Sequence, residues 1–143
     1  MLPETQGLAT SVLVADDNPA TLAAVAQFLT EEHYRVVGAV PDGGKLIAEA
    51  MELKPDVAVV DIFMPTINGL EAVAELSRMH CGTKFIMLTA ANQPEFTRAA
   101  LKAGASAYVL KNHLVTDLPI AIESALRGEK FLSPTLADSS RHS

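Results

Sequence analysis

Five polar residues, each at the downstream end of a short apolar run, have the chemistry needed to hold and transfer a charged group. They are Asp16, Asp17, Asp61, Thr89 and Lys111. Carboxylates brought together repel one another unless a cation lies between them, and a hard divalent ion with oxygen ligands, most simply Mg²⁺, meets that need. The lysine adds a compact positive charge and the threonine a hydroxyl donor. The set is typical of phosphoryl transfer, in which a carboxylate can itself be the nucleophile.

The apolar runs that end at these residues are predicted to be buried strands of a parallel sheet. The runs cover 12–15, 57–60, 85–88 and 107–110, and stretches with helical spacing separate them. Continuous apolar runs of this length are typical of strands that are covered on both faces. In such sheets ligands bind at the carboxyl ends of the strands. We therefore expect the five polar side chains to converge on one edge of the sheet.

Strand and helix patterns alternate along the chain. Strands are predicted at 11–15, 34–40, 57–61, 84–89 and 107–110, and helices at 19–32, 45–54, 70–80, 94–103 and 115–127. Asn18 can cap the first helix with Pro19 in its first turn, and Gly104 can end the fourth. Residues 41–44 are predicted to be a turn. The alternation predicts an α/β fold with a parallel sheet, right-handed crossovers and helices on both faces.

Length and composition limit the class of protein. The 143 residues suffice for one domain with a sizeable core. A net charge of −6 argues against nucleic-acid binding by this chain alone, because neutralising phosphates requires a basic surface. The single cysteine, Cys81, excludes an internal disulfide and is typical of a reducing compartment. Residues 1–10 read as a loose leader that lacks signal-peptide features, and no run reaches the roughly 18 apolar residues of a membrane span. We therefore expect a cytoplasmic protein that does not enter membranes.

Five segments around the polar residues resemble the receiver domain of two-component response regulators. They are Val14-Ala15-Asp16-Asp17-Asn18, Val60-Asp61-Ile62-Phe63-Met64-Pro65, Asn68-Gly69, Leu88-Thr89-Ala90 and Tyr108-Val109-Leu110-Lys111. The resemblance covers about residues 10–130, with every segment in order. It implies a (βα)5 flavodoxin-like, doubly wound parallel sheet with the strand order 2-1-3-4-5. The domain plan is then a leader at 1–10, a receiver domain at 11–130 and a linker or tail at 131–143.

The resemblance implies a phosphoacceptor with a divalent cation beside it. Asp61 is then the residue that takes the phosphoryl group, and Asp17 is a direct ligand of Mg²⁺, which Mn²⁺ could replace. Asp16 acts mainly through metal-bound water, and the backbone carbonyl of Phe63 completes the protein ligands. The chemistry implied is self-phosphorylation and self-dephosphorylation, so we do not expect an enzyme that acts on a separate substrate.

The resemblance also implies a switch. Lys111 pairs with the phosphoryl group, Thr89 bonds one of its oxygens and moves toward it, and Tyr108 turns inward when Thr89 moves. Many receivers have a proline after the lysine, joined by a cis peptide, whereas this chain has Asn112. A non-proline cis bond costs about 2.5–4 kcal/mol, so we expect a trans bond here. The surfaces expected to respond are those of the helix at 94–103, the strand at 107–110 and the helices at 19–32 and 115–127.

The segment after the last predicted helix resembles the junction that closes receivers of the NarL/FixJ (LuxR-type) subfamily. It reads Ala125-Leu126-Arg127-Gly128-Glu129-Lys130-Phe131-Leu132-Ser133-Pro134, and a helix-turn-helix DNA-binding domain usually follows it there. The nine residues after Pro134 are too few for such a domain. We therefore expect the receiver part of a transcription factor, phosphorylated by a cognate histidine kinase, with DNA contacted only through a C-terminal domain absent from this chain. The alternative is a stand-alone receiver that acts as a phosphorelay or protein-interaction module.

Two other classes of protein share part of this pattern. Phosphatases of the haloacid dehalogenase type use an aspartate after a strand, with Mg²⁺ and a lysine. They need a second acid two residues later, where this chain has Phe63. A flavodoxin-like cofactor binder needs a Ser/Thr/Gly-rich phosphate loop after the first strand, where this chain has Asp16-Asp17-Asn18-Pro19. Both classes fit less well than a receiver.

The first predicted helix is unusual because residues 19–30 contain no charged side chain. Its buried stripe is expected to comprise Leu22, Val25 and Leu29. Small uncharged residues such as Ala24 are then left outside, and residues 118–122, including Ile122, are also apolar on more than one side. Together these helices predict an exposed patch and a two-fold homodimer through it, strengthened by phosphorylation. The alternative is an ordinary helix surface of small residues.

Overall fold

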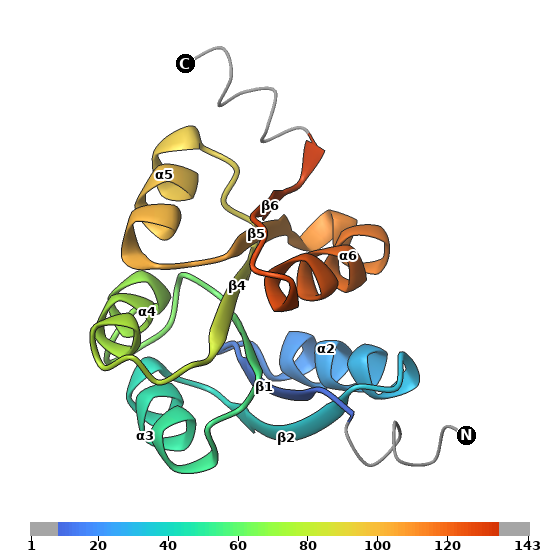
Figure 1. The fold of residues 1–143 in the computed structure, drawn as a ribbon, viewed down its shortest axis with the longest axis horizontal. Coiled ribbons are helices and arrows are strands. Elements are labelled where there is room, and N and C mark those ends of the chain that lie inside the picture. The colour runs from blue at the N-terminus through green and yellow to red at the C-terminus, as the bar shows by residue number, and fades with distance from the viewer. Residues whose placement is uncertain (1–8, 135–143) are drawn as a thin grey trace.

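Six parallel strands form one sheet in the computed structural model, which describes residues 9–134 (Figure 1). The strands are β1 (Ser11–Ala15), β2 (Arg35–Val40), β3 (Val57–Val60), β4 (Lys84–Thr89), β5 (Ala107–Leu110) and β6 (Phe131–Leu132). The helices are α2 (Pro19–Glu31), α3 (Gly43–Leu53), α4 (Gly69–Arg78), α5 (Pro94–Ala103) and α6 (Leu114–Leu126), and a 3₁₀ turn at Lys111–His113 precedes α6. The order β2-β1-β3-β4-β5-β6 confirms the doubly wound parallel fold. Within residues 9–134, no helix has the length and apolar character needed to cross a membrane.

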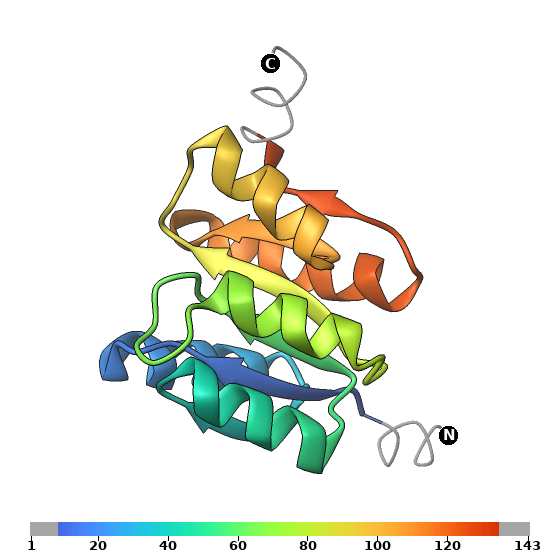
Figure 2. The same ribbon diagram turned by 90° about the vertical axis from the view of Figure 1, so that its left-hand side faces the viewer.

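The helices form two layers, one on each face of the sheet. α3, α4 and α5 cover one face, and Figure 2, turned so that this layer faces the viewer, shows them side by side. α2 and α6 cover the other face (Figure 1). Each layer closes its own apolar core, one around Leu46 and Val73 and the other around Val25 and Leu118. β1, β3 and β5 are buried along their whole length, as strands covered on both faces should be.

Polar caps fix where two of the helices near the site begin. The Asn18 side chain accepts a backbone hydrogen bond from the first turn of α2, and Pro19 is the first residue of that helix, as predicted. α3 begins at Gly43, two residues before its predicted start. The reason is that the side chain of Asp42 caps the helix by accepting a hydrogen bond from the Lys45 N–H. The sequence pattern instead predicted a turn over the two glycines that follow Asp42.

A sixth strand lies where the sequence predicted the start of a tail. Phe131 pairs with Ala107, and Leu132 pairs with Tyr108, both in parallel. Assigning Phe131 and Leu132 to the tail was therefore wrong, while residues 135–143 lie outside the described part of the chain. Two apolar residues are too few to give a strand pattern. They become a strand because β5 offers an open row of backbone donors and acceptors.

Hydrogen bonds around Ser133 clasp this strand to the rest of the domain. The Ser133 N–H donates to the carbonyl of Tyr108 at 3.1 Å, and the Leu110 N–H donates to the Ser133 hydroxyl at 3.2 Å. The same hydroxyl donates to Oδ2 of Asp117, a buried carboxylate of α6, at 2.8 Å. The end of the described chain is thus attached to both β5 and α6.

The face formed by α2 and α6 differs in one respect from the prediction. Ile122 was expected in the exposed patch, but it is fully buried, because it follows Leu118 by one helical turn on the side of α6 that faces the sheet. The apolar residues that α6 does expose include Val115 and Ile120, with exposed fractions of 70% and 51%. Ala24 of α2 is exposed, as predicted.

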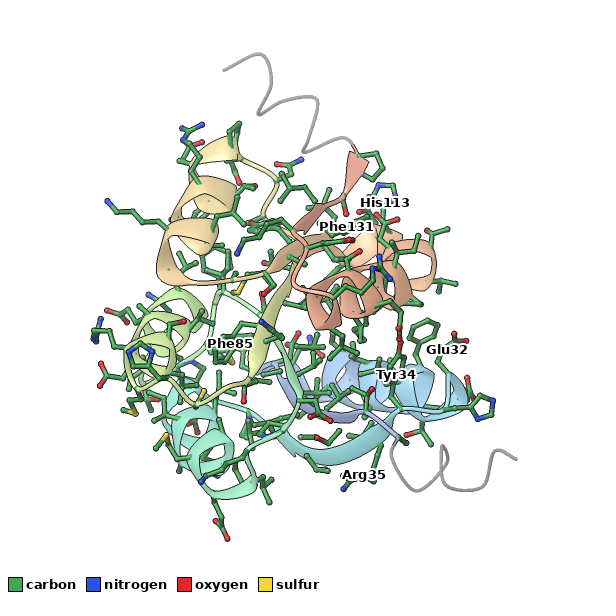
Figure 3. The ribbon with its side chains drawn as sticks, in the orientation of Figure 1. Glu32, Tyr34, Arg35, Phe85, His113 and Phe131 are labelled. Atoms are coloured by element: carbon green, nitrogen blue, oxygen red, sulfur yellow. The ribbon has the colours of Figure 1, made fainter. Side chains whose placement is uncertain are left out.

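Tyr34 joins α2 to α6 at one end of this face. It lies just after α2, and Figure 3 shows its side chain directed toward α6. Its hydroxyl donates to Oε2 of Glu123 at 2.8 Å. Burial, together with the hydrogen bond and negative charge of Glu123, raises the pKa of Tyr34 above its usual value, so the phenol remains a donor.

Candidate functional site

Three carboxylates meet at the carboxyl edge of the sheet. Asp16 and Asp17 follow β1, and Asp61 follows β3, its neighbour in the sheet. One oxygen from each residue lies within 4.8 Å of the other two. Asp16 and Asp61 are buried, whereas Asp17 is exposed. Parallel strands end side by side, which is why the sequence placed these residues together correctly.

Lys111 lies against two of the three carboxylates. Its Nζ is 2.8 Å from Oδ2 of Asp16 and 3.1 Å from Oδ2 of Asp61. Burial lowers the pKa of the Lys111 ammonium, but the hydrogen bonds and negative charges of Asp16 and Asp61 outweigh that effect and raise the pKa above its usual value. The lysine is therefore a fixed positive charge beside Asp16 and Asp61.

The donor set fits a divalent cation. Oδ1 of Asp61 is buried and has no hydrogen-bond partner among the described residues, while its Oδ2 binds Lys111. A buried carboxylate oxygen without a partner is costly, which marks the place as one built for a ligand. Oxygens from three carboxylates at this spacing suit a hard ion such as Mg²⁺. Asp61 Oδ1 and the exposed carboxylate of Asp17 are the groups best able to reach such an ion.

The loop between β3 and α4 runs very close to Asp61. The Gly69 N–H donates to the carbonyl of Ile62 at 2.6 Å. A Cβ atom at position 69 would lie 2.1 Å from the backbone oxygen of Asp61, so the loop tolerates only glycine there. Phe63 lies in this loop, two residues after Asp61, and its side chain is 54% exposed. Its ring contacts that of Phe96 in α5 edge to face, with centroids 5.6 Å apart.

Thr89 and Tyr108 are connected through the backbone of Ala91. Thr89 ends β4 and is fully buried, and its Oγ1 accepts a long hydrogen bond of 3.4 Å from the Ala91 N–H. The Tyr108 hydroxyl donates to the carbonyl of the same Ala91 at 2.7 Å. The Tyr108 ring is fully buried, so it already points inward in this structure. Burial and the negative charge of Asp61 raise the pKa of Tyr108 above its usual value. Its role as a switch stays a prediction.

The peptide bond after Lys111 is trans, as predicted, since residues 9–134 contain no cis peptide bond. Asn112 lies in the short 3₁₀ turn before α6. Sequence reasoning assigned no place to Phe96 and no contact to Ala91. Ala91 acts through its backbone, and a single phenylalanine in a helix carries no signal of its ring partner, so neither contact could be read from the residue type.

Comparison with known protein families identifies the family of this chain. The sequence profile of the response regulator receiver domain matches residues 12–123. The chain belongs to the response regulator receiver domain family. The predicted family membership is thereby confirmed, and its homologues are two-component response regulators and transcriptional regulators.

Relatives and solved structures point to the LuxR group within this family. An uncharacterized transcriptional regulatory protein YvfU of Bacillus subtilis is 35% identical over 87% of this chain and 63% of its own length. The response regulator GacA of Pseudomonas viridiflava is 34% identical over 88% of this chain and 59% of its own length. The chain thus spans about three fifths of these relatives. A LuxR-family two-component response regulator from Aurantimonas superposes with a TM-score of 0.89 at 27% identity, covering 94% of this chain and 96% of that one.

Proposed function

We propose that this receiver accepts a phosphoryl group on Asp61 in a reaction that requires a divalent cation. The observation that carries the proposal is the buried, unpartnered Oδ1 of Asp61 within an acid cluster that also holds a lysine. Support also comes from a similar solved structure, the isolated receiver domain of RcsB from Salmonella enterica in the presence of phosphomimetic BeF3⁻. It has 29% identity and a TM-score of 0.82 over 91% of this chain and 97% of that one.

Four residues would hold the cation. Both oxygens of Asp16 are engaged, Oδ1 by the Asn18 N–H at 2.9 Å and Oδ2 by Lys111, so Asp16 reaches the ion mainly through water. Asp17, Asp61 and the Phe63 carbonyl would be the direct ligands. When bound, Mg²⁺ or Mn²⁺ neutralises the charge that develops on the transferred phosphoryl oxygens.

The transfer needs only a nucleophile and charge neutralisation. A carboxylate oxygen of Asp61 attacks the phosphorus of a phosphohistidine in a histidine kinase. The new O–P bond forms as the P–N bond breaks, and the electron pair goes to the imidazole nitrogen. Lys111, already 3.1 Å from Asp61, pairs with the phosphoryl group that is added there. Water attack on the acyl phosphate later returns Asp61 and inorganic phosphate.

The signal leaves the site through Thr89. Its hydroxyl accepts a long 3.4 Å bond from the Ala91 N–H, and its own O–H can donate to a phosphoryl oxygen, which adds a charge-assisted bond. Moving the hydroxyl toward the phosphoryl group breaks its bond to the Ala91 N–H, while the Ala91 carbonyl stays bonded to Tyr108. Two packings of this loop follow, and phosphorylation shifts the population between them. Thr89→Ala should therefore accept a phosphoryl group without the change in assembly described below.

The output is a two-fold dimer through α2 and α6 that brings two downstream DNA-binding domains together. The relatives named as transcriptional regulators are longer than this chain, and RcsB, which is 28% identical, has been solved as dimers bound to DNA. The exposed apolar residues of α6 supply the contact surface. A cognate histidine kinase is the expected donor of the phosphoryl group, and the cytoplasm is the expected location of this chain.

The test of phosphoacceptance uses acetyl phosphate with Mg²⁺ and intact mass. The parent chain should gain the mass of one phosphoryl group, and Asp61→Asn should gain none. Omitting Mg²⁺, with a chelator present, should prevent the gain in the parent. Equal labelling of Asp61→Asn would contradict the assignment.

The dimer is tested by sedimentation before and after phosphorylation. Because Ile122 is buried, the charges are placed at exposed positions, as Ala24→Glu combined with Ile120→Glu. This variant should be phosphorylated normally but remain monomeric. Met51→Glu, an exposed apolar position of α3 on the opposite face, is the matched control and should dimerise as the parent does. Dimerisation of the double variant at parental strength would place the interface elsewhere.

A further inference from the structure

Phe63 and Phe96 form an aromatic pair that bridges two loops at the carboxyl edge of the sheet. Their ring centroids are 5.6 Å apart and their planes meet at 80°, an edge-to-face geometry. Phe63 lies in the loop after β3, two residues after Asp61. Phe96 lies in the first turn of α5, directly after the loop that contains Ala91. The pair therefore connects the loop after β3, in which Phe63 is a proposed cation ligand, to the loop after β4, in which Ala91 is proposed to respond to phosphorylation.

The two rings are held to different degrees. Phe96 is partly buried and packs against the core under α3, α4 and α5, and its N–H donates to the Gln93 carbonyl at 3.1 Å. Phe63 is more than half exposed. Phe96 is thus the fixed member of the pair, and Phe63 is the member whose position depends on the contact.

The backbone of the Phe63 loop leaves the carbonyl of residue 63 available. Within the described residues, backbone hydrogen bonds in this loop end on the carbonyls of Ile62 and Pro65, not on that of Phe63. Those bonds fix the backbone on both sides of Phe63 but do not fix the plane of its own carbonyl. The contact of its ring with Phe96 restrains the Cα and Cβ atoms of Phe63, and thereby limits the backbone rotations that would turn its carbonyl.

We infer that Phe96 is a positioning residue for the cation site. It holds the ring of Phe63 and so keeps the Phe63 carbonyl directed at the cation beside Asp61. The inference rests on the proposed function, in which that carbonyl is a ligand. An edge-to-face pair contributes enough that its loss should weaken Mg²⁺ binding about two- to tenfold. Because Phe96 lies in α5, directly after the loop that contains Ala91, a movement of that loop or of α5 would also change the cation site.

The test is a double-mutant cycle on Mg²⁺ affinity, measured by calorimetry on the whole chain with Mg²⁺ alone and no phosphoryl donor. Phe63→Ala and Phe96→Ala should each weaken binding, and the double variant should bind no more weakly than Phe63→Ala. Phe96→Tyr keeps the ring and should bind as the parent does. Phe96→Leu fills much of the same volume without an aromatic edge, so it should bind weakly and serves where Phe96→Ala fails to fold.

Phe28→Ala is the matched control. Phe28 is also a partly buried phenylalanine, but it lies on α2 and packs against the core on the opposite face. Its loss should lower thermal stability and leave Mg²⁺ affinity unchanged. The inference would be overturned if Phe96→Leu bound Mg²⁺ with parental affinity. It would also be overturned if the fold-loss of affinity in the double variant equalled the product of the two single fold-losses. If the parent chain itself does not bind Mg²⁺, the proposed function fails as well. If the parent binds Mg²⁺ and Asp17→Ala abolishes that binding, the proposed cation site stands. A parental affinity in Phe96→Leu then counts against the Phe96 inference alone.

Discussion

Replacing Lys111 with methionine tests whether the lysine acts as the resident cation of the acid cluster. Methionine keeps the unbranched chain and removes the charge that lies 2.8 Å from Asp16 and 3.1 Å from Asp61. Both carboxylates are buried, with exposed fractions of 3% and 6%, so little water replaces the lost partner. The domain should therefore become less stable, although its fold and core are untouched.

The magnitude follows from the burial of the groups. Removing one partner of a fully buried ion pair costs about 3–5 kcal/mol, because a charge is left uncompensated. The Lys111 side chain is 26% exposed, so water offsets part of that loss. We expect the free energy of unfolding of Lys111→Met to fall by about 2–3 kcal/mol, which lowers the melting temperature by about 5–10 °C.

Mg²⁺ should reverse this loss. It supplies the missing positive charge, so it should stabilise Lys111→Met more than it stabilises the parent.

The assay is chemical denaturation with and without Mg²⁺. Lys102→Met, an exposed lysine of α5, is the control and should change stability by less than about 0.5 kcal/mol. If Lys111→Met loses no more stability than this control, or responds to Mg²⁺ as the parent does, the lysine is not the resident cation and the reasoning is refuted.

Three further predictions concern single contacts. Asp17→Ala removes the exposed member of the acid cluster, so the thermal stabilisation by Mg²⁺ should disappear in a melting experiment while the stability of the cation-free domain stays the same or rises. Tyr108→Phe leaves the carbonyl of Ala91 without its buried donor, which should lower the free energy of unfolding by about 1–2 kcal/mol in denaturant titrations. Ser133→Ala removes the hydroxyl that Asp117 accepts from, so amide exchange at 131–133 should accelerate by at least about tenfold, and unchanged protection there would contradict the clasp.

The sequence by itself determined the strands β1 to β5, their parallel direction and the gathering of the three acids. A strand such as Val57–Val60 is a local pattern, because four consecutive apolar residues can be buried only where both faces are covered. The polar residue that follows it, Asp61, must then lie at the carboxyl edge together with Asp16 and Asp17. In a parallel sheet, a residue that directly follows a strand lies at the carboxyl edge. The gathering of these three acids could therefore be predicted without knowing how the side chains pack.

Only the tertiary structure decided which of two similar residues faces inward. Ile120 and Ile122 have the same side chain and lie two positions apart on α6, yet one is half exposed and the other fully buried. Their difference is the rotation of α6 about its axis, which packing against the sheet sets. The sequence around them is apolar on several sides and leaves that rotation undetermined.

Contacts between distant segments were likewise beyond sequence patterns. Phe131 and Leu132 form a strand because β5 has an unpaired edge. Lys111 pairs with Asp16 as well as Asp61 because the folded sheet brings the three side chains together. The Phe63–Phe96 pair depends on how α5 lies over the sheet. Local preference in such short segments is weak compared with the free energy of the contacts they make. Those contacts exist only once the chain is folded.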